Sequence, residues 1–356
     1  MSYNFFKGKK VLITGHTGFK GSWLTLWLFL KGAKISGLSK NILTKPSHFQ
    51  LLNIKKKIRH HLIDLKDLKK VKKIINQTKP DYIFHLAAQA LVKKSYDKPI
   101  ETWLSNSVGT INLLEALKNV KKKTFVILIT SDKSYKNMEL KRGYRESDIL
   151  GGKDPYSASK ASAELAIQSY INSFFSNKKN NIFITIARAG NVIGGGDWSE
   201  DRLVPDCFKS WSKKKFVSIR NPNSTRPWQH VLEALNGYLT LASKLTENPK
   251  KFHGEVFNFG PKHSDNNSVS NVLKKIKTFY PNAKWKMKKS KKFYEANLLK
   301  LNSHKAYVKL NWKPKLSFSE NIKLVSNWYK NFYLKNKRKD IFSLSSEQIK
   351  LYEKLK

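Results

Sequence analysis

The segment that most limits how this chain can fold is VLITGHTGFKGSWL, residues 11–24. A short β-branched run leads into Gly15, Gly18 and Gly21, and an apolar helical pattern follows. Glycines at this spacing permit a tight turn and a close approach of the backbone to a ligand. A pyrophosphate can then lie against the amino end of the helix, where free amides and the helix dipole favour negative charge. The segment therefore predicts a strand, a nucleotide-binding loop and a helix.

The rest of the first half alternates between strand-like and helix-like segments. Buried strands are predicted at residues 11–14, 34–38, 82–86, 125–130 and 182–188. Helices are predicted at residues 22–31, 68–77 and 100–118. This repetition indicates an α/β fold with a doubly wound, Rossmann-like parallel sheet covered by helices on both faces. We predict that residues 1–189 form this domain.

From about Gly190 the alternation gives way to loops rich in Gly, Asn and Pro. Helices are predicted here at residues 203–213, 231–244, 268–280, 317–335 and 345–356, the last beginning at a Ser-rich cap. We predict that residues 190–356 form a smaller, irregular substrate-binding region, some segments of which pack back on the first domain.

The net charge of +44 is the most unusual feature of the composition, with 69 Lys plus Arg against 25 Asp plus Glu. A chain this basic is drawn to polyanions. Only 8 of the cations are Arg, however, and Arg is the residue that makes bidentate contacts to phosphates and guanine edges. The Lys residues are spread along the whole chain with no run longer than three. We therefore interpret most of them as solvated surface and expect no specific nucleic-acid partner.

Cys207 is the only cysteine, so no intrachain disulfide can form and a reducing compartment is expected. The first residues lack the apolar core of a signal peptide. The most apolar run, residues 23–30, is far shorter than the roughly 20 residues that span a bilayer. These features predict a cytoplasmic protein with no membrane partner. The apolar and aromatic content, 40% and 12%, excludes a disordered chain.

Tyr156 and Lys160 are four residues apart and would share one face of a helix. A phenol with a pKa near roughly 10 is a poor base at neutral pH. An ammonium one turn away, together with a bound nicotinamide cation, stabilises the phenolate. In so Lys-rich a chain this spacing alone is more often surface, but here it follows a nucleotide-binding loop. We therefore predict that both residues are catalytic.

The predicted cofactor groove lacks one expected residue. After the second strand the chain reads Leu38-Ser39-Lys40, without the acidic residue that normally holds the ribose hydroxyls of NAD. NAD and NADP stay open at this position, since Lys40 can tolerate a 2′-phosphate. The predicted cofactor contacts are Gly15, Thr17, Gly18, Phe19, Gly21, Asp64, Leu65, Leu86, Ala87, Ala88, Tyr156 and Lys160.

Taken in chain order, the motifs resemble those of the extended short-chain dehydrogenase/reductases that act on nucleotide sugars. They are GHTGFKGSWL (15–24), TSDKSY (130–135), DPYSASK (154–160), ARAGNVIGGGDW (187–198), DRLVPD (201–206), RPWQHV (226–231) and SSEQIKLYE (345–353). The resemblance covers almost the whole chain and is most specific at FKGSW and GGGDW. It implies a Rossmann-like fold, NAD as the cofactor and, within the family, a sugar 4,6-dehydratase.

The residues after the fifth strand distinguish dehydratases within this family, and here they are Ser131, Asp132 and Lys133. Oxidation at C4 makes the C5 proton acidic, so the elimination needs a base at C5 and an acid at C6 besides Tyr156 at the C4 hydroxyl. The resemblance implies that Lys133 is the C5 base, where most other sugar dehydratases carry Glu. It implies that Asp132 is the acid at C6 and that Ser131 hydrogen-bonds the C4 oxygen. A loop with solvated charges is the alternative.

Arg202 and Arg226 are two of the few arginines, and a planar guanidinium grips a diphosphate better than an ammonium does. The resemblance places them against the nucleotide diphosphate, whereas ion pairs with Asp201 or Glu233 are the competing explanation. The predicted substrate contacts are Gln89, Ser131, Asn191, Arg202 and Arg226.

No metal site is expected, because His16 in the glycine-rich loop has no partner ligands at a useful spacing. His16 is expected to line the cofactor groove instead. Trp198, Trp211 and Trp228 are able to stack on a base, but core packing is favoured for them.

The resemblance implies conversion of CDP-D-glucose to CDP-4-dehydro-6-deoxy-D-glucose and water, for deoxysugar synthesis such as that of lipopolysaccharide O-antigen. A nucleotide-sugar 4-epimerase or a dehydratase for dTDP-, GDP- or UDP-sugars is the alternative within enzymes. A basic Rossmann protein that binds polyanions without catalysis is the alternative of a different class. Helices at 100–118 and 155–173 are expected to pair across a two-fold axis, which predicts a homodimer, with a tetramer as the alternative.

Overall fold

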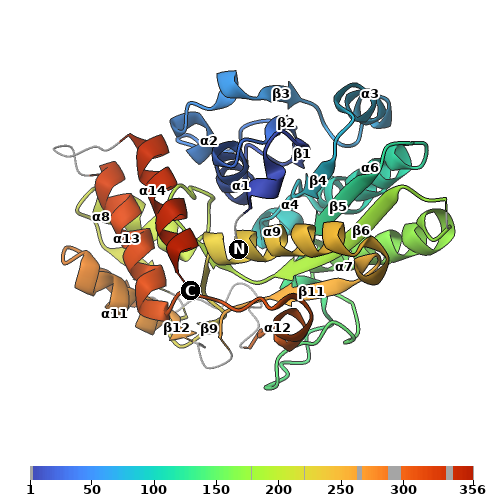
Figure 1. Cartoon of the computed structure of the whole chain (residues 1–356). Helices are drawn as coiled ribbons and strands as arrows, with labels where there is room; N and C mark the ends of the chain where they lie inside the picture. The colour runs from blue at the N-terminus through green and yellow to red at the C-terminus, as the bar shows by residue number, and fades with distance from the viewer. Residues whose placement is uncertain are drawn as a thin grey trace.

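A seven-stranded parallel sheet forms the centre of the computed structural model, which describes residues 3–177, 179–219, 221–262, 267–287, 298–333 and 340–355 (Figure 1). Its strands are β1 (Lys10–Thr14), β2 (Lys34–Ser39), β3 (Arg59–Leu62), β4 (Tyr82–His85), β5 (Thr124–Ile129), β6 (Ile182–Ala189) and β11 (Val256–Phe259). They lie in the order β3-β2-β1-β4-β5-β6-β11, and every neighbouring pair is parallel. The predicted Rossmann-like α/β fold is confirmed.

All five predicted strands form, with ends that shift by one residue at most. Two further strands extend the sheet at its edges. β3 is one of them, and β11 comes from beyond residue 190 and pairs with β6. The division of the chain at residues 189 and 190 stays a prediction.

The first half contributes the helices α1 (Phe19–Leu30), α2 (His48–Leu51), α3 (Leu68–Thr78), α4 (Val92–Asp97), α5 (Pro99–Trp103), α6 (Gly109–Leu117) and α7 (Pro155–Tyr170). Short turns of helix are η1 (Asn4–Phe6), η2 (Lys55–Lys57), η3 (Leu104–Val108), η4 (Asp132–Ser134) and η5 (Ile171–Phe175). The helix predicted at 100–118 is thus three consecutive pieces, because the π-helical turn η3 separates α5 from α6. The first helix begins at Phe19, three residues before its predicted start, since Gly18 serves as the N-cap.

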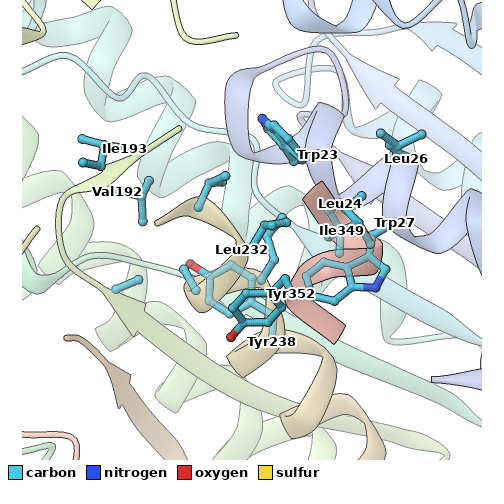
Figure 2. Close-up of a cluster of buried hydrophobic side chains, with 14 of the residues drawn as sticks. Trp23, Leu24, Leu26, Trp27, Val192, Ile193, Leu232, Tyr238, Ile349 and Tyr352 are labelled. Carbon is cyan, nitrogen blue, oxygen red and sulfur yellow. The ribbon is translucent and has the colours of Figure 1, made fainter. Parts of the chain in front are cut away.

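The sheet separates two hydrophobic cores, because successive side chains of a strand point to opposite faces. Val11 and Ile13 of β1 belong to the core that also contains α1, whereas Leu12 belongs to the core beneath α3, α6 and α7. Figure 2 shows part of the first core, where Trp27 of α1 packs edge-to-face against Tyr352 from the C-terminal half. The two halves of the chain therefore share one core.

The C-terminal half is assembled from short elements around three longer helices. The elements are β7 (Val192–Ile193), α8 (Leu203–Trp211), β8 (Val217–Ile219), β9 (Thr225–Arg226), β10 (Gln229–His230), α9 (Val231–Glu247), α10 (Pro249–Phe252), β12 (Asn267–Ser268), α11 (Val269–Phe279), β13 (Trp285–Met287), α12 (His304–Leu310), α13 (Phe318–Tyr333) and α14 (Ile341–Lys354). α9 packs on β5 and β6, and Figure 1 shows it lying across the sheet.

The final helix was predicted to begin at residue 345, and this start is wrong. α14 begins at Ile341, because the side chain of Asp340 accepts the amide of Ser343 and caps the helix four residues earlier. Residues 334 and 335 of the helix predicted at 317–335, and residue 356 of the last helix, lie outside the described residues. None of the described helices has the combination of length and apolar character that a bilayer crossing requires.

Candidate active site

The predicted site residues gather where the central strands end. Thr14, the last residue of β1, lies opposite Leu38 of β2 and His85 of β4 in the register of the sheet. The strand order reverses between β1 and β4, since β2 lies on one side of β1 and β4 on the other. In open parallel sheets ligands bind beyond the carboxyl ends of the strands at such a point. The loops after β1, β4, β5 and β6 thus meet at the position a dinucleotide takes in this fold.

The glycine-rich loop fits a dinucleotide because its glycines leave no room for side chains. Gly15 has a φ of +75°, and a Cβ there would lie 2.7 Å from the amide nitrogen of Ala87. A Cβ on Gly21 would lie 2.0 Å from the carbonyl oxygen of Gly15. Gly18 caps α1 without any side chain, and the first turn carries no acidic residue, so its amides face outward uncovered. This cradle is the arrangement that a pyrophosphate needs.

Of the other predicted cofactor residues, Thr17 belongs to this loop, and Asp64 and Leu65 follow β3. Thr17 is buried and donates its hydroxyl to the carbonyl of Asn41, 2.7 Å away. Leu65 is buried, whereas Asp64 is partly exposed. Lys40 Nζ lies 3.3 Å from Asp64 Oδ2 and 3.5 Å from Glu101 Oε1. Two carboxylates therefore already balance the cation that was expected to tolerate a 2′-phosphate.

The segment after β4 is fixed by polar contacts beneath the groove. The amide of Ala87 donates to Thr14 Oγ1, which lies 2.8 Å from His85 Nδ1. Leu86, Ala87 and Ala88 are half-buried beside the glycine-rich loop. The Gln89 side chain donates to the carbonyl of Leu91 and to Thr102 Oγ1, so its amide group shapes this loop. A contact of Gln89 with substrate stays a prediction.

Tyr156 and Lys160 lie on the first two turns of α7, which Asp154 caps by accepting the amide of Ser157. Both side chains are buried. Burial lowers the pKa of Lys160 to about 8, and Nζ lies 3.5 Å from the carbonyl oxygen of Ile129. Burial also raises the pKa of Tyr156, while a hydrogen bond with Ser131 opposes that rise. The phenol thus directly contacts the loop after β5.

Ser131, Asp132 and Lys133 form the loop that follows β5, which we call the elimination loop after its predicted role. Its first two residues are buried, and Ser131 Oγ donates to Asp132 Oδ1 at 3.0 Å. Lys133 Nζ lies 3.9 Å from the same carboxylate, with about a quarter of its side chain exposed. Asp132 Oδ2 is buried and has no hydrogen-bond partner among the described residues. Because a buried carboxylate oxygen without a partner is costly, this atom is available to a ligand hydroxyl.

The substrate-side residues approach the same carboxylate from the C-terminal half. A Cβ on Gly190 would lie 3.3 Å from Asp132 Oδ2 and 3.1 Å from Pro227, which places the segment that carries Arg226 beside the elimination loop. Asn191 follows Gly190, and its carbonyl accepts the amide of Gln229. Arg202 precedes α8, and its charge acts on the pKa of Tyr156.

The carboxylates of the two competing ion pairs each contact another part of the chain. Asp201 lies 3.2 Å from Lys93, and Glu233 accepts the backbone amides of Lys315 and Leu316. Arg226 donates to the carbonyl of Thr225. The contacts of Arg202 and Arg226 with a diphosphate stay predictions.

Lys20 is a residue of this site to which the sequence analysis gave no role. It lies in the first turn of α1, and Nζ reaches 3.5 Å from the hydroxyl of Tyr238 on α9. Burial lowers its pKa to about 8, and the neighbouring charges of Arg202 and Asp132 act on it. It is the only cation inside the glycine-rich motif, and this was the signal that could have identified it.

His16 and the three tryptophans are packed among other side chains of the protein. His16 is fully buried, and its Nε2 lies 2.6 Å from His60 Nδ1. Trp211 and Trp228 are buried and Trp198 packs against the first core, so the core interpretation is confirmed for all three. Among the described residues, no three His, Cys, Asp or Glu side chains are placed to hold a metal ion.

Comparisons with known proteins agree with this geometry. The family profile described as GDP-mannose 4,6 dehydratase matches residues 12–325. The CDP-glucose 4,6-dehydratase of Salmonella typhimurium is 44% identical over 331 residues, which cover 92% of this chain and 92% of that protein. The dTDP-D-glucose 4,6-dehydratase of Dictyostelium discoideum is 30% identical over 285 residues, covering 75% of this chain and 61% of that protein.

Solved structures share the fold at lower sequence identity. The UDP-glucose 4-epimerase of Thermotoga maritima with UDP-glucose superposes with a TM-score of 0.79 at 23% identity, covering 91% of this chain and 99% of that chain. The UDP-glucuronic acid 4-epimerase of Bacillus cereus, in complex with UDP-glucuronic acid and NAD, has a TM-score of 0.75 at 22% identity, covering 91% of this chain and 99% of that one. These likenesses show the fold.

Proposed function

Since the chain belongs to the GDP-mannose 4,6-dehydratase family, we propose that it is a nucleotide-sugar 4,6-dehydratase with CDP-D-glucose as its substrate. The observation that carries the proposal is the buried, unpartnered Oδ2 of Asp132, which lies in a loop that contacts Tyr156. Epimerisation at C4 requires only the oxidation and reduction that Tyr156 and Lys160 support. Dehydration requires an acid and a base in addition, and Asp132 and Lys133 supply these groups.

NAD is the cofactor. The glycine cradle and the uncovered amides of α1 fit its pyrophosphate. The pairing of Lys40 with Asp64 and Glu101 favours NAD over its 2′-phosphorylated form, because two carboxylates repel an added phosphate. When bound, NAD supplies the chemistry of accepting a hydride from the sugar C4 and returning it to C6.

The side chains of the protein accept and donate the protons of the reaction. Tyr156, as phenolate stabilised by the Lys160 ammonium, accepts the proton of the C4 hydroxyl as the ketone forms. Lys133, as the free amine, takes the proton from C5, and the electron pair of that bond forms the C5–C6 double bond. Asp132 in its protonated form donates to the C6 hydroxyl, which leaves as water. After hydride returns to C6, Lys133 returns a proton to C5, so the product gains one solvent-derived hydrogen there.

The nucleotide is expected beyond the sugar, toward the C-terminal half. Arg202 and Arg226 come from separate elements on the side of Asp132 from which Gly190 and Pro227 approach. Guanidinium groups suit the two phosphates of a nucleoside diphosphate. The 44% identity to a CDP-glucose dehydratase over 92% of the chain favours cytidine as the base.

Product analysis tests the proposal. The purified protein is incubated with NAD and, side by side, with the CDP, dTDP, UDP and GDP forms of glucose, and of mannose for GDP, in deuterated water. We expect a 4-keto-6-deoxy sugar carrying deuterium at C5, formed fastest from CDP-glucose. A C4 epimer as the sole product would contradict dehydration, and a faster reaction with another nucleotide would contradict the choice of CDP. Turnover that persists with competing polyanions at moderate salt excludes the non-catalytic alternative.

We also propose a homodimer formed through the packed helices α5 and α7. Ile100, Trp103 and Leu165 on these helices and Phe174 on η5 are exposed apolar side chains in neighbouring elements. Exposed apolar side chains gathered on neighbouring elements are typical of subunit interfaces. Light scattering after size exclusion should give the mass of two chains, and Leu165→Glu should give one; a monomeric wild type would contradict the proposal. The cytoplasmic location stays a prediction.

A further inference from the structure

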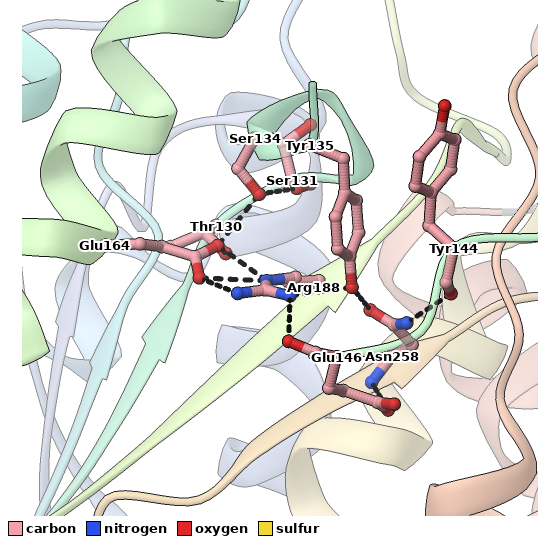
Figure 3. Close-up of polar contacts among 9 residues, drawn as sticks. All are labelled: Thr130, Ser131, Ser134, Tyr135, Tyr144, Glu146, Glu164, Arg188 and Asn258. Carbon is pink, nitrogen blue, oxygen red and sulfur yellow. Dashed lines mark hydrogen bonds and ion pairs between the residues drawn. The ribbon is translucent and has the colours of Figure 1, made fainter. Parts of the chain in front are cut away.

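A buried ion pair lies directly behind the elimination loop. Arg188 on β6 and Glu164 on α7 are both inaccessible to solvent, and Arg188 Nε donates to both carboxylate oxygens at 2.9 and 2.8 Å. Arg188 Nη2 also contacts Glu164 Oε2. Figure 3 shows the carboxylate of Glu164 between the guanidinium on one side and the loop hydroxyls on the other. A buried ion pair adds little to the free energy of folding compared with apolar packing. We therefore ask whether this pair serves the reaction instead.

The carboxylate holds the elimination loop at both ends. Thr130, immediately before Ser131, donates its hydroxyl to Glu164 Oε1 at 2.6 Å. The hydroxyl of Ser134, immediately after Lys133, lies 2.9 Å from the same oxygen and 2.6 Å from the carbonyl of Ser131. The three residues proposed for elimination are therefore bracketed by two hydroxyl contacts to one side chain.

Arg188 continues the same network on the far side of the loop. Its Nη1 donates to the hydroxyl of Tyr135 at 2.7 Å and to the carbonyl of Glu146 at 3.1 Å. Tyr135 in turn donates to Asn258 Oδ1 on β11 at 2.8 Å. The loop is thus held against β6 and β11 as well as α7, and fully satisfied buried networks of this type specify one arrangement.

The position of Glu164 on α7 gives the network its significance. Tyr156, Lys160 and Glu164 are spaced by four residues and share one face of the helix. The helix that presents the groups for oxidation at C4 therefore also carries the side chain that holds the loop for elimination at C5 and C6. The contacts of Glu164 therefore link the two sets of groups, in addition to the contact between Tyr156 and Ser131.

We propose that Glu164 and Arg188 are positioning residues that set the elimination loop relative to Tyr156, so that their contacts govern elimination far more than oxidation. The inference rests on the proposed dehydratase function. Small displacements of a reacting group are costly, because a misplacement of about 1 Å lowers rates by roughly a hundredfold. Loss of the contacts should separate the two half-reactions, since Tyr156 and Lys160 keep their own helix.

The variant that tests the loop contacts most specifically is the double substitution Thr130→Val and Ser134→Ala. It removes both hydroxyls and leaves the ion pair intact. It also leaves the charge of Glu164, which acts on the pKa of Lys160, unchanged. The matched control is Thr124→Val, at the opposite end of β5, where a buried hydroxyl donates to the carbonyl of Pro80. Conservative replacement by Thr130→Ser and Ser134→Thr keeps both hydroxyls. Glu164→Gln is the direct variant, and the hydroxyl variants keep the test valid if it fails to fold.

Two rates are measured in single turnovers of holoenzyme with CDP-glucose in deuterated water: the absorbance of reduced nicotinamide, and the 4-keto-6-deoxy product with its C5 deuterium. In the Val/Ala double variant we expect product formation to fall by roughly tenfold or more while nicotinamide reduction changes by less than about twofold, so that reduced nicotinamide accumulates. The control and the conservative variant should match wild type in both rates.

The outcomes are distinguishable. If both rates fall in the same proportion, or neither changes, the positioning role is overturned while dehydration by wild type still stands. If Thr124→Val separates the rates as strongly as the double variant, the effect is a general loss of packing and the inference fails. Wild-type enzyme that yields only a C4 epimer overturns the proposed function, and the inference with it.

Discussion

The glycine-rich loop and the elimination loop reach the same point of the sheet by different means. The first lies within residues 15–21, and its conformation depends on contacts inside the loop and with the end of β4. The second spans residues 131–133, and its position depends on Glu164, thirty residues later, and on Arg188 and Asn258 further along the chain. One is a local motif, and the other is assembled by the tertiary fold.

The difference shows why the cofactor site and the reaction need not evolve together. A loop set by its own glycines can be kept across many enzymes of one fold, whereas a loop held by remote side chains can be changed without disturbing the dinucleotide. We expect the residues after β5 to decide between oxidation alone and dehydration, on a fold that hosts both reactions.

The largest effect should come from the local loop. Gly15→Ala forces a residue at φ +75° and drives a Cβ to 2.7 Å from the backbone of Ala87. Left-handed strain costs about 1–2 kcal/mol, and overpacking adds about 1–3 kcal/mol. We expect the free energy of unfolding to fall by about 2–5 kcal/mol and NAD binding to be lost, measured by denaturant unfolding and cofactor titration.

Gly8→Ala is the matched control, because Gly8 has a φ of +76° and nothing within 4 Å of its added Cβ. It should lose only the strain, about 1–2 kcal/mol, and should still bind NAD. Equal losses in the two variants would show that contact with β4 does not set the loop.

A smaller effect is expected where the two regions meet. Lys20 belongs to the glycine-rich motif, yet Nζ contacts Tyr238 and the charge interacts with Asp132. At the effective dielectric of a protein interior such an interaction is worth about 1–2 kcal/mol. Lys20→Met should therefore lower kcat/KM for CDP-glucose by roughly tenfold, whereas Lys56→Met, on an exposed turn, should leave it unchanged. Unchanged activity in Lys20→Met would show that Lys20 does not couple the glycine-rich loop to the elimination loop.

The effect that is smallest for each group taken singly concerns pH. Burial lowers the pKa of both Lys20 and Lys160 to about 8. Both ammonium charges are present below that pH and leave the site as pH rises through it, so kcat/KM should decline on the alkaline side. The decline for each group is about fourfold half a pH unit above its pKa. Lys20→Met should give a shallower decline than wild type, since Lys160 alone then titrates; equal slopes would contradict a shared role.

The sequence was sufficient for the parts whose signals are local. The strands of β1, β4, β5 and β6, the glycine-rich loop and the Tyr156 and Lys160 pair follow from period, turn chemistry and helical spacing. The start of α14 differs from its prediction because Asp340 caps the helix ahead of Ser345 and Ser346. The break of the helix at η3 ends at Gly109, and a single Gly inside a helical pattern is too weak a signal to predict a break.

The assembled parts of the site were out of reach for a different reason. Glu164 and Arg188 look like ordinary helix and strand residues, and only the pairing of β5 with β6 brings Arg188 beside the loop. Lys20 is the only cation in the glycine-rich motif, but its interaction with Asp132 depends on the packing of α1 against α9. Long-range contacts of this kind leave no periodic trace in one sequence.

The measurement that tests the account most directly is a single turnover of Lys133→Met with CDP-glucose in deuterated water. About a quarter of the Lys133 side chain is exposed at the edge of the loop, so its loss should not disturb the fold. We expect reduced nicotinamide to appear as in wild type, because Tyr156 and Lys160 are intact, with no deuterium at C5 and no 4-keto-6-deoxy product. Full dehydratase activity in this variant would remove Lys133 from the mechanism and contradict the division of labour between the two loops.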